Sequence, residues 1–214
     1  MARASTNSTD MPCRSFSPPT GGGGVIIDIG TGDGLFVYQS ARQNPDKLYI
    51  GIDVSAGALE KISEKIHRQP TRGGLSNVLF VQAAVEELPS ELDGVADEVH
   101  VHFPWGSLLR AVGSGDEAVL RNLRRICAYG AWLEIVMGLD PERDRSEVER
   151  LGLNPLSAEF LEEVLKPRYQ AAGFEVTEEG VLPPAEWPPL RTSWGQRLRG
   201  GVGRFLLYIV ARAV

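Results

Sequence analysis

The chain has 214 residues, 43% of them hydrophobic and 23% charged, with a net charge of −6 at pH 7. This length is typical of one domain with a full hydrophobic core, and the acidic balance excludes a generally basic nucleic-acid binder. No run of 18 apolar residues could span a membrane, and the N-terminus lacks the apolar stretch of a signal peptide. Cys13 and Cys127 form no metal-type cluster with the three histidines, so we expect a reduced, cytoplasmic protein without a bound metal. We also expect a monomer.

The first 24 residues are rich in Ser, Thr, Pro and Gly and end in four consecutive glycines. They show no helical or strand periodicity, which predicts a flexible N-terminal segment over residues 1–24. We expect the folded domain to span residues 25–214.

The most informative stretch runs from Val25 to Asp53. An apolar, β-branched run over 25–29 is followed by glycines at alternate positions, Gly30, Gly32 and Gly34. A helix-compatible segment covers 35–43, and a second apolar strand over 48–52 ends at Asp53. This order is typical of the first half of a nucleotide-binding α/β sheet, in which the glycines admit a ligand and the acid binds ribose hydroxyls.

Two features of this turn favour S-adenosylmethionine (SAM) over NAD. Leu35 occupies the position of the last glycine in the dinucleotide-binding pattern. Asp28 and Asp33 would repel a pyrophosphate, but they suit the cationic amino and sulfonium groups of SAM.

The rest of the chain alternates strands and helices, which predicts an α/β fold with a mainly parallel, doubly wound sheet. Ser55 can cap the second helix, Pro70 stops it, and the segment over 140–149 is so charged that we expect it to be solvated. The predicted elements are helices over 55–67, 108–112, 117–127 and 161–172, and strands over 78–83, 98–103, 132–137, 174–181 and 205–211. Two closing strands after five βα units match the class I SAM-methyltransferase plan, a Rossmann-like sheet of seven strands with the last antiparallel.

Three further stretches suggest the substrate. Phe103–Leu109 places Trp105 at the carboxyl end of the fourth strand, and Thr192–Arg199 places Trp194 beside two arginines. The third stretch is basic and comprises Lys61, Lys65, His67, Arg68 and Arg72. Each has a structural alternative, a tryptophan that plugs the end of the sheet or a solvated basic surface. Together, two indoles and two basic flanks on one rim suit a flipped base and its phosphates.

At this level of detail the sequence resembles the aminoglycoside-resistance 16S rRNA methyltransferases that modify N1 of adenine 1408. The similarity covers roughly Val25 to the C-terminus, and its discriminating pair is Phe-Pro-Trp-Gly at 103–106 with Thr-Ser-Trp at 192–194. It is carried by the segments 28–34, 49–53, 65–77, 86–89, 103–109 and 192–194, and by Arg197.

The resemblance implies roles for individual residues. Trp105 and Trp194 would sandwich the flipped adenine, and Ser107 and Ser193 would help to shape the pocket. SAM would be held by Asp28, Gly30, Asp53, Val85 and Glu86, together with Gly32 and Asp33 of the turn. Phosphates of rRNA in the 30S subunit would be met by Lys65, Arg68, Arg72, Arg197 and Arg204.

Two departures from the family bear on ribosome binding. Residues 1–24 do not resemble the β-hairpin with which the family usually begins, and Val202 replaces an arginine for which Arg199 could compensate. Three other functions stay open: an RNA methyltransferase resembling the tRNA guanine-N7 enzymes, a small-molecule SAM methyltransferase, and a non-catalytic SAM- or RNA-binding protein. The tRNA enzymes favour an acid after the fourth strand, and Pro104-Trp105-Gly106-Ser107 contains none.

Overall fold

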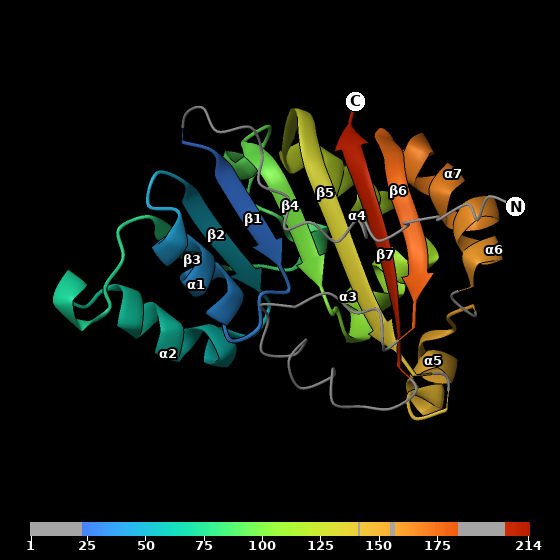
Figure 1. Cartoon of the computed structure of the whole chain (residues 1–214), viewed down its shortest axis with the longest axis horizontal. Coiled ribbons are helices and arrows are strands. Elements are labelled where there is room, and N and C mark those ends of the chain that lie inside the picture. Colours follow the sequence, from blue (N-terminus) through green and yellow to red (C-terminus); the bar gives the residue numbers. More distant parts are fainter. Residues whose placement is uncertain (1–22, 141, 155–156, 184–203) are drawn as a thin grey trace, which may run out of the picture.

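The computed structural model describes residues 23–140, 142–154, 157–183 and 204–214. Its centre is one seven-stranded sheet with the strand order β3-β2-β1-β4-β5-β7-β6 (Figure 1). The strands are β1 Val25–Ile29, β2 Leu48–Asp53, β3 Val78–Gln82, β4 Ala96–His102, β5 Cys127–Leu139, β6 Phe174–Leu182 and β7 Phe205–Ala213.

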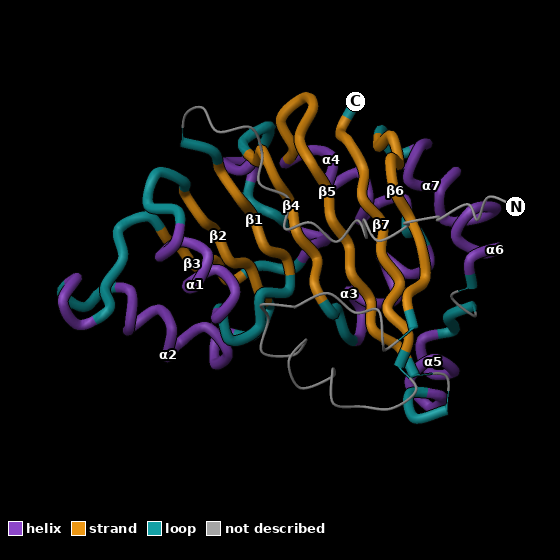
Figure 2. Tube along the Cα trace, viewed as in Figure 1, coloured by secondary structure: helices purple, strands orange, loops and turns teal. Residues whose placement is uncertain are grey.

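Strands β1 to β5 run parallel to one another, whereas β7 pairs antiparallel with both β5 and β6. Figure 2 shows the strands as one continuous twisted layer. This topology confirms the predicted α/β class and the antiparallel last strand. All five carboxyl ends of the parallel strands therefore meet at one edge of the sheet, which is where ligands bind in open α/β folds.

Successive side chains of a strand point to opposite faces of the sheet, so both faces are apolar here and both are covered by helices. Ile26 belongs to an apolar cluster with Val37 of α1 (Leu35–Gln43) and Ile62 of α2 (Ala56–Ile66). The adjacent Ile27 belongs to the larger core on the opposite face. That core takes in Leu109 of α3 (Gly106–Ser114) and residues of α4 (Glu117–Ile126).

Three expectations about the second half need correction. β5 begins at Cys127, directly after α4, and is 13 residues long rather than limited to 132–137. The helix expected over 161–172 is interrupted by a π-helical segment over Leu161–Leu165, between α6 (Ala158–Phe160) and α7 (Lys166–Ala171). The segment over 140–149 is not simply solvated. It leads into α5 (Arg145–Leu151), and its Asp140 and Asp144 are buried.

The remaining boundaries agree closely with the sequence. Ser55 accepts a hydrogen bond from the Ala58 amide, as expected of a helix cap, and a 3₁₀ turn at Pro70–Arg72 follows the second helix. The predicted flexible segment lies outside the described residues up to position 22. Among the described helices, none is long and apolar enough to cross a membrane.

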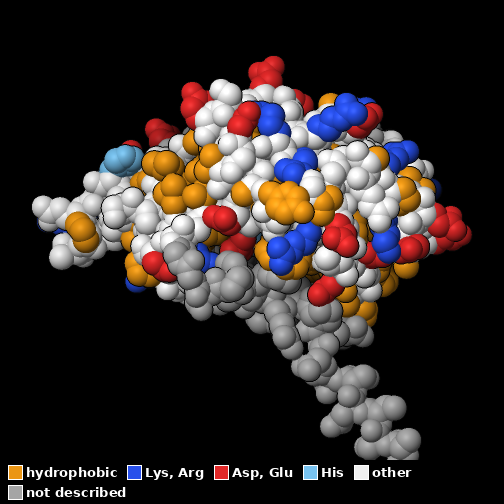
Figure 3. Space-filling view, turned by 90° about the horizontal axis from the view of Figure 1, so that it is seen from above, with side chains coloured by type: hydrophobic (Ala, Val, Ile, Leu, Met, Phe, Trp, Pro, Cys, Tyr) orange, Lys and Arg blue, Asp and Glu red, His pale blue; other side chains and the backbone are white. Residues whose placement is uncertain are grey.

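Seen from above, at the edge where the parallel strands begin, acidic and basic side chains are interspersed (Figure 3). A surface of mixed sign is a poor electrostatic match for a polyanion. The candidate site lies at the opposite edge.

Candidate active site at the carboxyl edge of the sheet

A cavity of about 240 Å³ lies at the carboxyl ends of β1, β2 and β4. It is lined by nearly all of the described residues that the sequence assigned to cofactor or base. These are Gly30, Gly32, Asp33, Asp53, Val85, Glu86, Trp105 and Ser107. Segments up to 77 positions apart in the sequence therefore meet in one site.

The glycine turn has the backbone conformation that requires glycine. Gly30, Gly32 and Gly34 have φ angles of 73°, 58° and 66°, which L side chains rarely adopt. A Cβ on Gly34 would lie 2.6 Å from the Phe80 ring, whereas a Cβ on Gly32 would point into open space. The amides of Gly30 and Thr31 both donate to the carbonyl of Ile52, so the turn is tied to β2.

Asp53 connects the two halves of the motif. Its Oδ2 accepts a hydrogen bond of 2.8 Å from the Gly32 amide, and its Oδ1 accepts one of 2.9 Å from the Ser55 amide. The carboxylate is half-buried at the cavity wall and is thereby held in a fixed orientation.

The other two carboxylates of the motif differ in position. Asp33 is exposed, lines the cavity and accepts a hydrogen bond from the Leu35 amide at the start of α1. Asp28 is only 4% exposed and does not line the cavity. Burial raises the pKa of the Asp28 carboxyl, and the nearby imidazole of His102 acts in the opposite direction. Asp28 therefore lies behind the wall rather than on it.

A residue that the sequence analysis missed supports the wall near Val85 and Glu86. The Asn122 amide of α4 donates to the carbonyl of Val85 at 3.1 Å and to that of Glu86 at 2.9 Å. These carbonyls belong to a 3₁₀ turn, Val85–Glu87, which follows β3. One side chain from a distant helix thus fixes the edge of the cavity.

The turn after β4 presents an indole at the mouth of the cavity. Phe103 has a φ of 50°, a left-handed conformation that is unusual for a residue other than glycine, and its amide donates to the Val136 carbonyl at 2.7 Å. Trp105 follows and is 54% exposed, although it is a large apolar side chain. Ser107, in the first turn of α3, is also exposed and lines the same cavity.

A buried polar network that the sequence analysis did not predict lies beside this turn. His102 Nε2 lies 2.6 Å from Glu134 Oε1, and His100 lies 3.5 Å from both Glu134 and Glu98. Lys47 completes the network with a 3.3 Å contact to Glu98. The signal in the sequence is the alternation Glu-Val-His-Val-His over 98–102, which places three ionisable side chains on one face of a buried strand.

In this network the carboxylates of Glu98 and Glu134 alternate with the basic side chains of Lys47, His100 and His102. Burial alone would lower the pKa of His100, but hydrogen bonds to Glu134 and Glu98 raise it from 6.5 to about 10. Burial would raise the pKa of Glu134, but hydrogen bonds from the two imidazoles hold it well below its ordinary value. His100, His102 and Glu134 are also residue types that could bind a metal ion. Two ligand atoms at 2.0–2.1 Å from one tetrahedral zinc would lie roughly 3.3 Å apart. The 2.6 Å separation of His102 and Glu134 is instead that of a charge-assisted hydrogen bond.

The basic residues assigned to phosphates differ in availability. Arg68 and Arg72 are exposed, next to the 3₁₀ turn after α2. Lys65 is half-buried, and its Nζ lies 3.9 Å from the centre of the Tyr38 ring. Four other assigned residues lie outside the described residues, namely Ser193, Trp194, Arg197 and Arg199.

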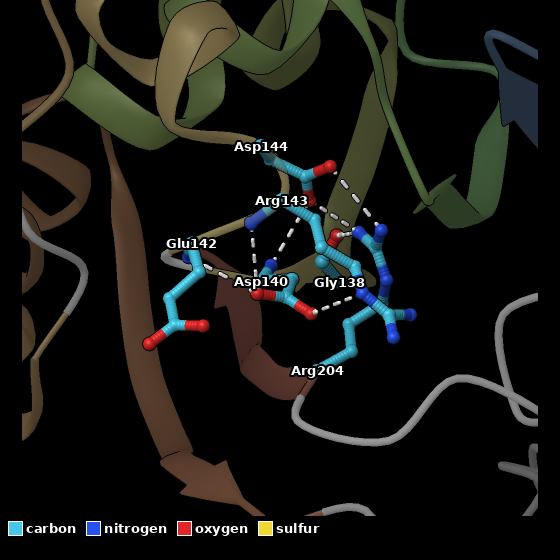
Figure 4. Close-up of polar contacts among 6 residues, drawn as sticks. All are labelled: Gly138, Asp140, Glu142, Arg143, Asp144 and Arg204. Atoms are coloured by element: carbon cyan, nitrogen blue, oxygen red, sulfur yellow. Dashed lines mark hydrogen bonds and ion pairs between the residues drawn. The ribbon is translucent and has the colours of Figure 1, made fainter.

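Arg204 is held inside the protein at the start of β7 (Figure 4). Its guanidinium binds both carboxylate oxygens of Asp144, at 2.5 and 3.2 Å, and donates to the Gly138 carbonyl at 2.8 Å. The Asp140 amide in turn donates to Asp144. Amides of Arg143 and Glu142 lower the pKa of Asp140, against the effect of burial. The guanidinium is therefore already paired, and its contact with a phosphate stays a prediction.

The sequence and the fold are similar to those of known rRNA methyltransferases. The protein-family model described as NpmA: 16S rRNA (adenine(1408)-N(1))-methyltransferase matches residues 20–213. A 16S rRNA (adenine(1408)-N(1))-methyltransferase from Streptoalloteichus tenebrarius is 40% identical over 182 residues, which cover 85% of this chain and 83% of that protein.

Two solved structures extend this likeness to three dimensions. That of the aminoglycoside resistance methyltransferase NpmB1 is 46% identical, with a TM-score of 0.77, and the match covers 89% of this chain and 87% of that one. A mutant 16S rRNA (adenine(1408)-N(1))-methyltransferase from Catenulisporales acidiphilia, solved with cosubstrate SAM, is 34% identical, with a TM-score of 0.81 over 90% of this chain and 87% of that one. The chain therefore belongs to the 16S rRNA (adenine(1408)-N(1))-methyltransferase family.

Proposed function

We propose that this protein transfers a methyl group from SAM to N1 of adenine 1408 in 16S rRNA of the 30S subunit, and so confers resistance to aminoglycosides. The observation that carries the proposal is the position of Trp105. An indole that is 54% exposed stands at the mouth of a cavity built from a glycine turn and the Asp53 carboxylate. Membership of the family supplies the identity of the target base.

The residues of the cavity fit SAM. Asp53 would bind the ribose hydroxyls, and the glycine turn leaves open space at Gly32 for the approach of a ligand. His102 lines the cavity, and its Nδ1 is a buried polar atom without a hydrogen-bond partner among the described residues. A polar ligand would satisfy such an atom, because buried polar groups in proteins are almost always paired.

The chemistry places few demands on protein side chains. SAM supplies a methyl group that is activated by its positively charged sulfur. Adenine N1 has a lone pair in the plane of the ring, so no general base has to act before attack. Trp105, with Trp194 on the other side, would hold the flipped base and stabilise its growing positive charge through the π faces. Stacking contributes roughly 1–3 kcal/mol per base, which is comparable to the few kcal/mol that unstacking costs.

Docking would involve the exposed Arg68 and Arg72 on one flank, and Lys65, Arg197, Arg199 and Arg204 as further phosphate contacts. Ser107 and Ser193 would shape the base pocket, Val85 and Glu86 would hold the adenosine of SAM, and Asp28 would support this site from behind. We further propose that the protein acts as a metal-free monomer in the cytoplasm, where its ribosomal substrate is found.

The experiment is methyl transfer from radiolabelled SAM to purified 30S subunits, 50S subunits and total tRNA, with product mapping by primer extension. We expect label in 30S alone and a reverse-transcription stop at position 1408. Label in tRNA would instead favour a guanine-N7-type activity. SAM binding without transfer to any RNA would favour a small-molecule enzyme or a non-catalytic protein.

A further inference from the structure

Among the described residues that line the cavity, His102 is the only one whose side chain can carry a positive charge. Three lining side chains are carboxylates, those of Asp33, Asp53 and Glu86. SAM has a sulfonium, an α-ammonium and an α-carboxylate. The carboxylates of the cavity complement the two cationic groups, but the α-carboxylate of the ligand needs a donor, preferably a charged one.

His102 lies at the appropriate end of the cavity. The lining follows the sheet in spatial order, from Val85 after β3, through Asp53 on β2 and the glycine turn after β1, to His102 on β4. With the ribose on Asp53 and the transferable methyl facing Trp105, the amino-acid end of SAM extends toward β1 and β4. In that pose the imidazole would lie at the same end of the cavity as the methionine carboxylate.

The ring of His102 is held in place by its neighbours. Nε2 donates to the Glu134 carboxylate at 2.6 Å, and the Phe36 ring packs edge-on against the imidazole with 4.9 Å between ring centres. Glu134 is an anion at neutral pH, because its pKa is held low. The other nitrogen, Nδ1, is buried and has no hydrogen-bond partner among the residues that the structure describes. A buried polar atom beside a ligand cavity is a strong candidate for a ligand contact.

We propose that His102 binds the α-carboxylate of SAM through its Nδ1–H, and that Glu134 is the positioning residue that holds the imidazole for this contact. With Nε2 turned to the Glu134 carboxylate and Nδ1 to that of the ligand, the imidazole ring would lie between two carboxylates. The inference rests on the proposed use of SAM. It makes His102 the residue that distinguishes SAM from analogues without the α-carboxylate.

The test compares SAM with decarboxylated SAM, which keeps the sulfonium and the ammonium but lacks the carboxylate. Calorimetry would measure both affinities for the unaltered protein, for His102→Gln and for His100→Gln. His100 is the matched control, because it belongs to the same network and strand but does not line the cavity. Circular dichroism and melting curves would establish that each variant is folded at the assay temperature.

We expect the unaltered protein to prefer SAM by about tenfold to a hundredfold, the range of a charge-assisted hydrogen bond. His102→Gln should lose most of this preference by weakening SAM binding alone, and Glu134→Gln should lose part of it, whereas His100→Gln should keep it. A preference that persists in His102→Gln would overturn the inference, as would an equal loss of affinity for both ligands, which would indicate a contact with the ammonium. An unaltered protein that binds SAM without any preference overturns this inference alone, whereas one that binds neither ligand overturns the proposed function as well.

Discussion

The ring of Phe103 lies against Gly138 so closely that a Cβ added to Gly138 would be 3.0 Å from the ring carbon Cε1. Gly138 is near the end of β5, and Phe103 occupies its left-handed conformation directly after β4. The missing side chain at Gly138 thus makes room for the ring of Phe103, whose left-handed backbone begins the turn that leads to Trp105. We therefore expect the position of the exposed indole to depend on this contact between two neighbouring strands.

Gly138→Ala should therefore impair catalysis more than cofactor binding. The added methyl group would push against Phe103 and displace the loop that carries Trp105, and small errors in position can cost up to about a hundredfold in rate. We expect methyl transfer to 30S to fall at least tenfold while SAM affinity by calorimetry stays nearly unchanged. Gly57→Ala is the control, since a Cβ at Gly57 meets nothing within 4 Å. Equal activity of the two variants would show that this contact does not position the loop.

Asn122→Ala should weaken SAM binding although Asn122 does not line the cavity. Its amide holds the carbonyls of Val85 and Glu86, and each lost hydrogen bond contributes about 0.5–1.5 kcal/mol. We expect the Kd for SAM to rise about three- to tenfold, with little change in the rate at saturating SAM. Arg121→Ala, an exposed neighbour on α4, should leave the Kd unchanged. A normal Kd for Asn122→Ala would mean that the turn is rigid without this support.

Arg204→Ala should destabilise the protein, in contrast to Arg72→Ala. Arg204 and Asp144 form an ion pair in which the side chains are only 12% and 10% exposed. Removal of one partner of a buried pair costs roughly 3 kcal/mol, which corresponds to a decrease in Tm of about 6–12 °C for a domain of this size. Arg72 is exposed, so its removal should reduce 30S affinity without changing the Tm. Equal melting temperatures for the two variants would identify Arg204 as a free surface cation.

The stability of the protein should fall at alkaline pH because of His100. Its pKa in the folded protein, about 10, is above the ordinary value of 6.5, so the stabilisation is fully present below about pH 6.5. It is lost as the pH rises from there through 10. We expect the difference in Tm between the unaltered protein and His100→Gln to be largest near pH 6.5 and to shrink by pH 10. Melting curves that differ by a constant amount across this range would show that His100 does not titrate in this way.

The sequence alone was sufficient for the sheet and for much of the cavity. β-Branched runs, alternate glycines and terminal acids are local signals, and they correctly located Asp53 and Trp105 at one edge, whereas Glu86 was assigned through the family resemblance. The sequence alone could not show which residues distant in the chain contact one another. The segment around Asp144 was predicted to be solvated because its charges dominate locally, whereas its partner Arg204 lies 60 positions away.

The buried histidines escaped prediction for the same reason. Glu98, His100 and His102 alternate along β4, but their meaning depends on Glu134, which the register of β4 with β5 places opposite His100. Asn122 is likewise the one uncharged polar residue of the amphipathic helix α4, and nothing in the sequence indicates which carbonyls it binds.

Primer extension across adenine 1408 tests the central proposal, that two indoles clamp the target base. An N1 methyl group blocks reverse transcription, so a stop at this position reports methylation directly. We expect Trp105→Ala and Trp194→Ala each to nearly abolish the stop while SAM binding persists, and the double variant to be little worse than either single one. Trp105→Phe should retain more activity, and Trp132→Phe, a change on β5, should retain it fully. A stop at full strength in both alanine variants would contradict the clamp, and a stop at a guanine elsewhere would contradict the proposed target.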